Sequence, residues 1–458
     1  MKKLNLLSML ILFATIISSC SKDSDEPTDG GAALEIVNLQ SGATLQGSYS
    51  GKDVRLAEGS YTLKAYVYLT GGSKLTIAPG SVIKSDVAEK GALIVERNSQ
   101  LIADGTAAKP IVFTSGRPVG QRNPGDWGGI ILLGNAPTNR TSEPTIEGGV
   151  GRAYGGTVAT DNSGIIRYVR IEFAGIAAEP NSEINGLTLG GVGSGTVIDY
   201  VQTVYANDDA YEFFGGTVNA KHLVAYATAD DDFDFDFGYG GKIQYGVSLR
   251  DPLFVDGGDA GNGIECDNDA TGSAATPLTK PILSNFTILG PNGAANTAAN
   301  HNFANRFRRG TTFVINNSIM LGHPDGGLSL ESNGTYSAFI AGTSEFKNNI
   351  VFALTAPFKL GSDVTVTGAT AAAIQTKALA DGTVSIANSA AAGLTDAFNL
   401  STPNFLPAGG SIALTGAAFT GTIGDSFFDK VAYKGAFGTT NWMAGWTSFT
   451  YVKTANGY

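Results

Sequence analysis

An acidic and aromatic motif recurs along the chain at the spacing of one coil of a solenoid. Residues 208–214 have the sequence DDAYEFF, and residues 230–236, 22 positions later, have the sequence DDDFDFD. A third, looser copy begins at Ile264, 31 positions after Phe233. A period near 22 is too short for a strand–helix unit and is typical of one coil of a parallel β-helix. The repeat therefore predicts an all-β fold, a parallel β-helix.

Within each copy, large apolar residues alternate with acids. Side chains of a strand alternate between its two faces, so we expect the apolar set to point into the core. That set comprises Tyr211, Phe213, Phe233, Phe235, Ile264 and Cys266. The acids are expected to form columns on the outside, with neighbouring coils about 4.8 Å apart. These columns comprise Glu212, Asp234 and Glu265, followed by Asp236 and Asp267.

Related strands extend the repeat over most of the chain. Residues 164–170 match residues 196–202, and short β runs ended by Gly, Pro or Asn precede them. Later versions lie at residues 221–224, 242–245, 285–288, 317–320 and 348–351. Helix-length segments between these strands are nearly absent, which argues against a doubly wound α/β sheet. A propeller or a sandwich leaves the 22-residue acidic register unexplained.

We expect the β-helix to span residues 35–360 and residues 361–458 to form its C-terminal part and a cap. A solenoid needs caps at both ends because its terminal strands have free edges. The Ala-rich segment 370–381 is expected to be a short helix that covers an end or a side. Trp442 and Trp446 are expected to cap the last coil, although exposed tryptophans can also stack on sugars.

The first 20 residues indicate export and lipid attachment. Lys2 and Lys3 precede an apolar run from Leu4 to Ile17, and Cys20 ends a sequence that resembles a bacterial lipobox. Residues 1–19 are therefore expected to be a lipoprotein signal peptide, and residues 20–34 an acylated cysteine with a flexible acidic tether. We expect the mature protein to be anchored in the outer membrane and to face the cell exterior.

Several chemistries find little support in the sequence. His222, His301 and His323 lack ligand spacing, so neither a zinc site nor a Ser-His-Asp triad is indicated. Cys266 has the parity of the core residues and is expected to be buried. The formal net charge of −11 argues against nucleic acid as a partner.

A wider set of motifs resembles one known family. These motifs are residues 75–80, 125–129, 168–175, 208–216, 230–238 and 433–438, with Trp442 and Trp446. They resemble a family of Bacteroidota lipoproteins and secreted proteins with a right-handed parallel β-helix, mostly of unassigned activity. The resemblance implies the fold over residues 45–450 and says little about the biochemistry.

Three interpretations of the acids remain open. They are structural ladders, a calcium site, or catalytic groups, and the first two are compatible. Clustered carboxylates offer the hard oxygen ligands that calcium prefers, and a cation relieves their mutual repulsion. The candidate metal ligands are Asp208, Asp209, Asp230, Asp231, Asp232, Asp234, Asp236, Glu265 and Asp267.

The catalytic hypothesis uses the same face. By analogy with polysaccharide lyases and hydrolases of this fold, the candidates are Asp209, Asp231, Asp234, Arg306 and Arg308. The histidine and the Arg-Ile-Lys segment of polygalacturonases are missing, and the two arginines are also expected to form ion pairs with the acids. We therefore favour a surface lipoprotein that acts as a binding or scaffold component, with a glycan ligand and an outer-membrane transporter as candidate partners. A calcium-dependent polysaccharide lyase or a glycoside hydrolase is the alternative.

Overall fold

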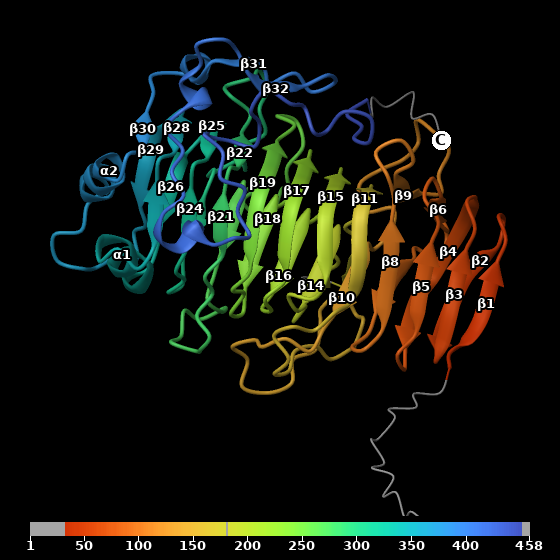
Figure 1. Ribbon diagram of the computed structural model, residues 1–458. Helices are drawn as coiled ribbons and strands as arrows, with labels where there is room; N and C mark the ends of the chain where they lie inside the picture. Colours follow the sequence, from red (N-terminus) through yellow and green to blue (C-terminus); the bar gives the residue numbers. More distant parts are fainter. Residues whose placement is uncertain (1–32, 180–181, 451–458) are drawn as a thin grey trace, which may run out of the picture. The chain divides into compact units, whose positions relative to one another are not determined.

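The computed structural model describes residues 33–179 and 182–450. Parallel strands stack coil upon coil into three faces around a single core, as Figure 1 shows. Each coil runs from the first face through a corner into the second face, and then turns into the third. The all-β parallel β-helix predicted from the repeat is confirmed. No helix in the described ranges is long and apolar enough to cross a membrane.

The first face contains the strands β1 (Glu35–Leu39), β3 (Lys52–Leu56), β5 (Lys74–Ile77), β8 (Gln100–Asp104), the first halves of β11 (Gly164–Glu172), β15 (Val197–Val204), β17 (Asn219–Tyr226) and β19 (Lys242–Leu249), and then β21 (Ile282–Ser284), β24 (Val314–Asn316) and β27 (Glu345–Lys347). The second face contains the first half of β4 (Ser60–Thr70), β6 (Val82–Ser85), β9 (Ile111–Ser115), the second halves of β11, β15, β17 and β19, and then β22 (Thr287–Leu289), β25 (Ile319–His323), β28 (Ile350–Ala353) and β30 (Val384–Ser385). The third face contains the second half of β4, β7 (Ala92–Val95), β10 (Ile130–Leu133), β14 (Leu187–Gly190), β16 (Tyr211–Phe214), β18 (Phe233–Asp236), β20 (Ile264–Cys266), β23 (Arg306–Phe307), β26 (Gly326–Leu330) and β29 (Ala356–Leu360). Strand β2 (Thr44–Ser50) pairs with both halves of β4.

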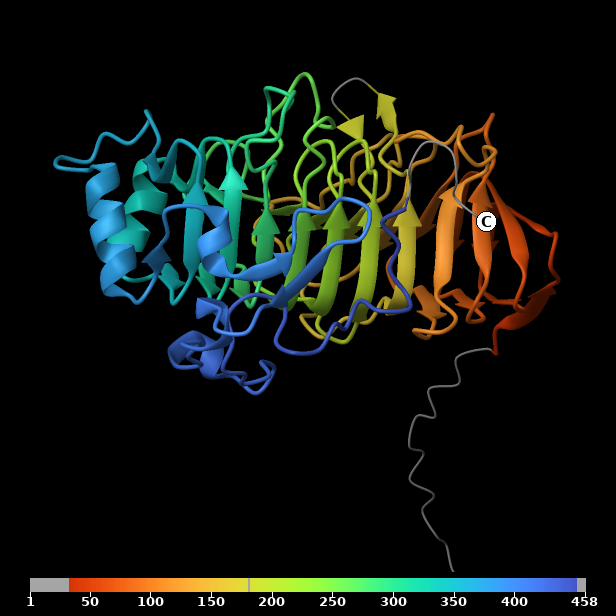
Figure 2. The same ribbon diagram turned by 90° about the horizontal axis from the view of Figure 1, so that it is seen from above.

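Elements outside the parallel ladder are short. They are the hairpins β12 (Ala177–Glu179) with β13 (Ser182–Glu183) and β31 (Leu394–Asp396) with β32 (Asn404–Pro407), the helices α1 (Asn333–Ile340) and α2 (Ala371–Ala380), and three 3₁₀ turns at Ser389–Ala392, Ile412–Leu414 and Gly421–Gly424. The two α-helices lie at the C-terminal end of the solenoid (Figure 2). The expected Ala-rich helix is present as α2, and its Ile374 and Ala378 are buried in the main core.

The strand register agrees with the predicted alternation. Tyr211 pairs with Phe233 and Phe213 with Phe235, and the rings of each pair stack with centroids 5.2 and 5.0 Å apart. Cys266 pairs with Phe235 and is fully buried. Stacking of like side chains along the axis fills the core continuously and fixes each coil against the next.

The corner between the first and second faces is built from residues with left-handed backbone. Tyr168, Tyr200, His222 and Tyr245 have φ between 49° and 67°. Their rings stack along the axis, with Tyr200 4.4 Å from Tyr168 and 4.1 Å from His222. Asparagines 285, 317 and 348 continue this corner at φ between 55° and 60°. Asparagine tolerates this conformation well, whereas the tyrosines need packing to hold it.

The C-terminal segment supplies that packing, and the expectation that Trp442 and Trp446 cap the last coil is wrong. The segment lies along the side of the solenoid, as Figure 2 shows in dark blue. Trp446 packs edge-on against Tyr168 and Tyr200 at 5.9 Å, far from the last coil. The stacked corner rings leave their edges uncovered, and burying apolar edges under tryptophan is favourable. Trp127 is also buried, at 1% exposure, and so presents no surface to a sugar.

Candidate metal centre

The third face brings five carboxylates together, which we call the acidic cluster: Asp208, Asp209, Glu212, Asp230 and Asp234. The turns before β16 and β18 supply the aspartates at 208, 209 and 230, and the outward positions of the two strands supply the other two. Carboxylate oxygens of Asp208, Asp209 and Asp230 lie within 4.8 Å of one another. Those of Asp209, Glu212 and Asp234 do the same, so Asp209 belongs to both groups.

Strand pairing explains why the acids converge. Glu212 pairs with Asp234, and Asp234 pairs with Glu265, so the predicted column of acids on one face is confirmed. Asp209 and Asp231 occupy equivalent positions two residues before the inward Tyr211 and Phe233. Coils stacked at the strand spacing must therefore place these charges side by side.

Asp209 and Asp231 also take part in a ladder along the turns. Asp209 Oδ1 accepts a hydrogen bond from the Asp231 backbone N–H at 2.8 Å, and Asp231 Oδ1 accepts one from that of Asn262. Asn262 Oδ1 accepts the equivalent hydrogen bond from the Phe303 backbone N–H at 3.1 Å. An asparagine thus fulfils this structural role one coil later. The aspartates keep a second oxygen that the ladder does not use.

The acids point away from the core, but they are not exposed as the sequence suggested. Asp209, Glu212 and Glu265 are only 6–8% exposed. A long loop between β10 and β11 covers them: Tyr154 packs on Phe214, and Glu147 approaches Glu212 through a shared contact with Asn185. The acids thus lie on the outside of the coils as expected, but the loop buries Asp209 and Glu212 and leaves Asp208, Asp230 and Asp234 partly exposed. Periodicity indicates which side of a strand a residue occupies, and it does not reveal what an inserted loop covers.

Burial and like charges raise the pKa values in the cluster. Desolvation and the charges of Glu147 and Asp209 hold the pKa of Glu212 well above its ordinary value. Desolvation and the neighbouring aspartates do the same for the pKa of Asp234. Burial raises the pKa of Asp231 to about 6 and that of Asp236 to about 8. Carboxylates with raised pKa values bind a proton or a cation readily.

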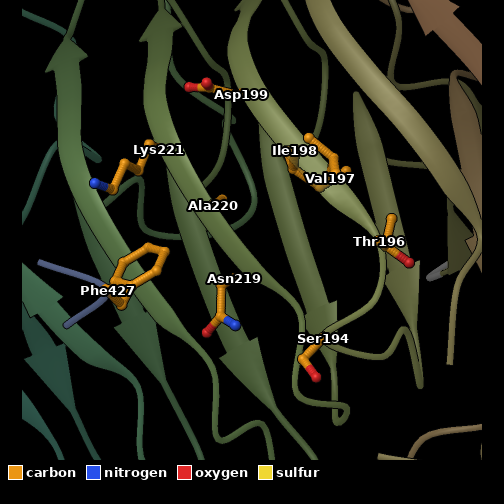
Figure 3. Close-up of a pocket in the computed structure, with 9 residues that line it drawn as sticks. All are labelled: Ser194, Thr196, Val197, Ile198, Asp199, Asn219, Ala220, Lys221 and Phe427. Carbon is orange, nitrogen blue, oxygen red and sulfur yellow. The ribbon is translucent and has the colours of Figure 1, made fainter. Parts of the chain in front are cut away.

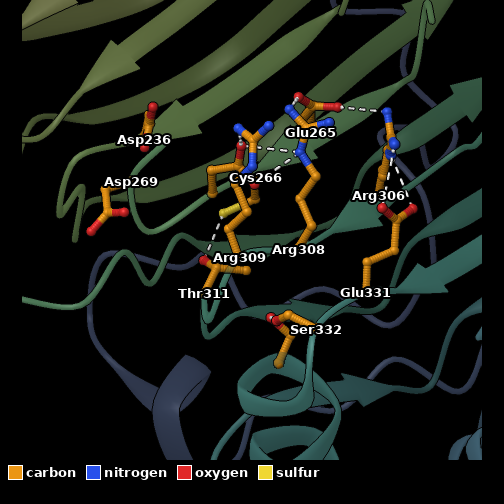
Figure 4. A network of polar contacts seen from close by, with 12 residues as sticks. Asp236, Glu265, Cys266, Asp269, Arg306, Arg308, Arg309, Thr311, Glu331 and Ser332 are labelled. Atoms are coloured by element: carbon orange, nitrogen blue, oxygen red, sulfur yellow. Dashed lines mark hydrogen bonds and ion pairs between the residues drawn. The ribbon is translucent and has the colours of Figure 1, made fainter. Parts of the chain in front are cut away.

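No side chain of Lys, Arg or His forms an ion pair with the five cluster acids in the described ranges. In contrast, the acids one coil further on are paired, as Figure 4 shows. Arg308 binds Asp267 at 2.9 Å and also contacts Glu265. Arg306 joins Glu265 to Glu331. The cluster thus ends at a neutralised ion-pair network. Arg250 and Arg308 act on Asp230 and Asp234 only from beyond ion-pair distance.

This network bears on the catalytic candidates. The expectation that Arg306 and Arg308 form ion pairs is confirmed. The neighbouring carboxylates raise the pKa of Arg308, which makes a neutral arginine base less accessible. Asp232 faces elsewhere: it is fully buried, accepts from Ser248 and pairs with Arg250 at 3.4 Å. Its carboxylate is therefore already compensated.

The described residues fit a hard cation. Every candidate ligand atom is a carboxylate oxygen, as calcium and magnesium require. Asp234 Oδ1 is buried without a hydrogen-bond partner in the described part of the chain. Asn185, at 1% exposure, also has an unpartnered Oδ1 beside Glu212. Such buried acceptors are costly unless a donor or cation satisfies them.

Sequence reasoning missed Glu147 and Asn185. Glu147 lies in the loop between β10 and β11, where no periodicity marks it. Asn185 occupies the repeat position of Asp209, two residues before the inward Leu187 that pairs with Tyr211. The sequence also gave no indication of the cavities. One, of about 280 Å³, lies on the first face, where Lys221, Asn219 and Phe427 line it (Figure 3). Lys221 there pairs with Asp429 at 2.9 Å, so its charge is already compensated.

Comparisons with known proteins identify the family. The chain belongs to the family of pectate-lyase-like β-helix domains, whose model matches residues 47–447. Among solved structures, the chain is similar to the crystal structure of pectate lyase Pel9A, with a TM-score of 0.34 and 11% sequence identity over 85% of this chain and 88% of that one. This similarity is too remote to transfer the role of any residue. No curated protein matches the chain significantly.

Proposed function

We propose that the protein is a calcium-dependent, glycan-binding β-helix protein of the outer cell surface. One observation supports the metal most strongly: two groups of three carboxylates share Asp209, with oxygens within 4.8 Å and no cationic partner in the described residues. The calcium-binding prediction now concerns mainly the five cluster acids, with Asp231 and Asp236 at its border. Glu265 and Asp267 already have arginine partners.

Calcium is the better candidate than magnesium. The cluster offers several carboxylates from different coils and a covering loop, which suits the six to eight oxygen ligands of calcium. Magnesium demands a smaller, near-octahedral shell and usually keeps several waters. When bound, the cation would offset the repulsion among the cluster acids and could offer open positions to an anionic ligand.

We propose a glycan as the ligand from the fold and the family alone. The proposal therefore names the chemical class of the ligand and no particular glycan. The calcium-dependent lyase remains a second candidate because the family is pectate-lyase-like. The pairing of Arg308 favours binding over lysis. Lipid attachment at Cys20, which lies outside the described residues, would hold the protein at the outer membrane, where a transporter could receive the ligand.

Calorimetric titration tests the proposal. Calcium should bind the EDTA-treated protein, and magnesium should bind much more weakly. Acidic polysaccharides should then bind only in the presence of calcium, without release of unsaturated products. Absence of calcium binding would refute the proposed function, whereas unsaturated products would establish the lyase instead.

A further inference from the structure

A second cavity lies on the same side of the molecule as the acidic cluster and has the opposite electrostatic character. Its volume is about 330 Å³, and we call it the arginine pocket. It is lined chiefly by Arg97, Thr138, Arg140, Thr141, Ser142 and Tyr154. Arg97 follows β7, and the other five belong to the loop that covers the acids. The volume is in the range of small-ligand sites, and five of the eleven lining residues carry a hydroxyl.

The two arginines make the pocket cationic within an acidic protein. The lining contains two arginines and one glutamate, Glu143, for a formal charge of +1 (2 − 1). Arg97 pairs with Glu143, which is itself 59% exposed. Arg140 has no ion pair in the described residues, and its guanidinium lies 4.4 Å above the ring of Phe237. Arg140 is otherwise exposed, so this cation–π contact leaves its N–H groups available to bind an oxyanion in the bidentate manner.

The remaining lining supplies neutral donors. Thr138 Oγ1 accepts a hydrogen bond from the Arg140 backbone N–H at 3.3 Å, which holds the loop beside the arginine. Tyr154 is 2% exposed, and no hydrogen bond of its hydroxyl is found within the described ranges. Burial raises the pKa of Tyr154, so its hydroxyl stays a donor at neutral pH.

The pocket adjoins the acidic cluster. Tyr154 packs on Phe214, with ring centroids 6.1 Å apart, and Phe214 shares the outward side of β16 with Glu212. Phe237, beneath Arg140, follows Asp236 directly.

We propose that the arginine pocket binds an oxyanion carried by a sugar, either a carboxylate or a sulfate ester. Arg140 donates hydrogen bonds to the oxyanion, and the hydroxyls of the loop contact the sugar. This inference deepens the proposed function and rests on it for the class of ligand. It gives the negatively charged protein a specific contact for an anionic saccharide beside the calcium site.

The test compares three probes: a uronic acid trimer, the same trimer reduced to its neutral form, and a sulfated neutral trimer. Wild-type protein should bind at least one anionic probe and not the neutral one. Arg140→Gln should weaken that binding about tenfold or more, the loss expected for a charge-assisted hydrogen-bonded pair. Arg152→Gln is the matched control, since Arg152 also stacks on an aromatic ring, 4.6 Å from Tyr68, but lies outside the pocket lining.

Equal affinity of wild type and Arg140→Gln for the anionic probes would overturn the inference, as would equal binding of the neutral trimer or no binding of any probe. Calcium titration of the same proteins separates the two proposals. Arg140-dependent binding without any calcium binding would uphold the pocket and refute the proposed function. Calcium binding with an anionic affinity that Arg140→Gln leaves unchanged would do the reverse.

Discussion

At the scale of single residues, Asp209 shows how one side chain combines a structural and a chemical role. One oxygen holds the next coil through the Asp231 backbone, and the carboxylate also belongs to both groups of potential metal ligands. Asn262 performs the first role without a charge. The charge at Asp209 is therefore unfavourable in the absence of a cation. Replacing Asp209 by asparagine keeps the hydrogen-bond acceptor and removes the charge, so the two roles can be tested separately.

Asp209→Asn should keep the fold and lose the response to calcium. The amide oxygen can still accept from Asp231, so we expect the melting temperature in EDTA to equal or exceed that of the wild type. Calcium at a hundredfold excess over Kd should stabilise the wild type by roughly 2.7 kcal/mol and the variant far less. Melting curves with and without calcium measure this difference.

Asp363→Asn is the control, because it removes one exposed carboxylate from outside the acidic cluster. It should respond to calcium like the wild type. Identical calcium responses of Asp209→Asn and the wild type would contradict the assigned role of Asp209.

The raised pKa values predict an unusual pH dependence in EDTA. Asp231 and Asp236 titrate at about 6 and about 8 in the folded protein, against an ordinary value of 3.8. Between about pH 4 and 8 the folded state therefore holds protons that the unfolded state has released, so stability should fall as pH rises. Calcium displaces these protons, and its stabilising effect should grow over the same interval. Melting temperatures that rise from pH 5 to 8 in EDTA would argue against buried, uncompensated acids.

Arg308 should matter for folding stability. Arg308→Gln leaves Glu265 and Asp267 with fewer partners at sites that are 8% and 4% exposed. Glu265 keeps Arg306 and Asp267 keeps Arg309, so we expect a loss smaller than the roughly 3–5 kcal/mol of leaving a buried charge with no partner. The double variant Arg308→Gln with Glu265→Gln should recover part of that loss, which a double-mutant cycle in urea would measure. A single variant as stable as the wild type would show that the pair is unimportant.

At the scale of elements, the C-terminal segment closes a seam that the coils cannot close themselves. Arg170 donates to the carbonyl oxygen of Trp446 at 2.8 Å, and Gln202 donates to that of Ser448 at 2.8 Å. Asn285 and Asn317 donate to backbone carbonyls of the same segment further along the corner. The segment thus satisfies polar groups and covers ring edges along one corner.

Trp446→Ala should lower stability by about 3–5 kcal/mol, because a fully buried tryptophan is lost. The strand content should persist, since Trp446 lies outside the parallel ladder. Far-ultraviolet circular dichroism and urea unfolding together test both points. Leu253→Ala, at a side chain 68% exposed, is the control and should change stability by less than about 0.5 kcal/mol. An unchanged unfolding midpoint for Trp446→Ala would rule out this role for the segment.

The elements also show why prediction from sequence succeeded in the strands and failed elsewhere. Alternation in residues 211–214 and 233–236 has period two, so the facing of Glu212 and Phe213 followed directly. The covering loop has no such pattern, and neither Glu147 nor Tyr154 could be assigned to the acids. The sequence pattern assigned Tyr168 and His222 to the middle of strands. Their left-handed backbone conformation could not be predicted, because neither residue type indicates it.

At the scale of the whole molecule, the β-helix gathers charge by repetition. Each coil adds acids at the same positions, so a small repeat builds a cluster that a single loop would not hold. The coil after the cluster carries Glu265 and Asp267, and in the next coil the same positions carry Arg306 and Arg308, which pair with these acids. The proposed cation site therefore lies in the coils whose repeat positions carry acids, and it stops where arginines compensate or replace them.

Attachment to the membrane is a separate prediction for the whole chain. Cys20→Ala should release the protein from the membrane fraction or leave the precursor unprocessed, because the acylated residue is removed. Fractionation and intact mass test this, with Cys266→Ser as a control that leaves the lipobox intact. Membrane association and mass unchanged by Cys20→Ala would refute the anchor.

The most direct test of the account is a crystal structure determined with calcium at the acidic cluster. We predict density for a cation bound by oxygens of Asp209 and other cluster acids, with ligand distances of about 2.3–2.6 Å. Clear density for these carboxylates hydrogen-bonded to one another or to water, with no cation at saturating calcium, would contradict it.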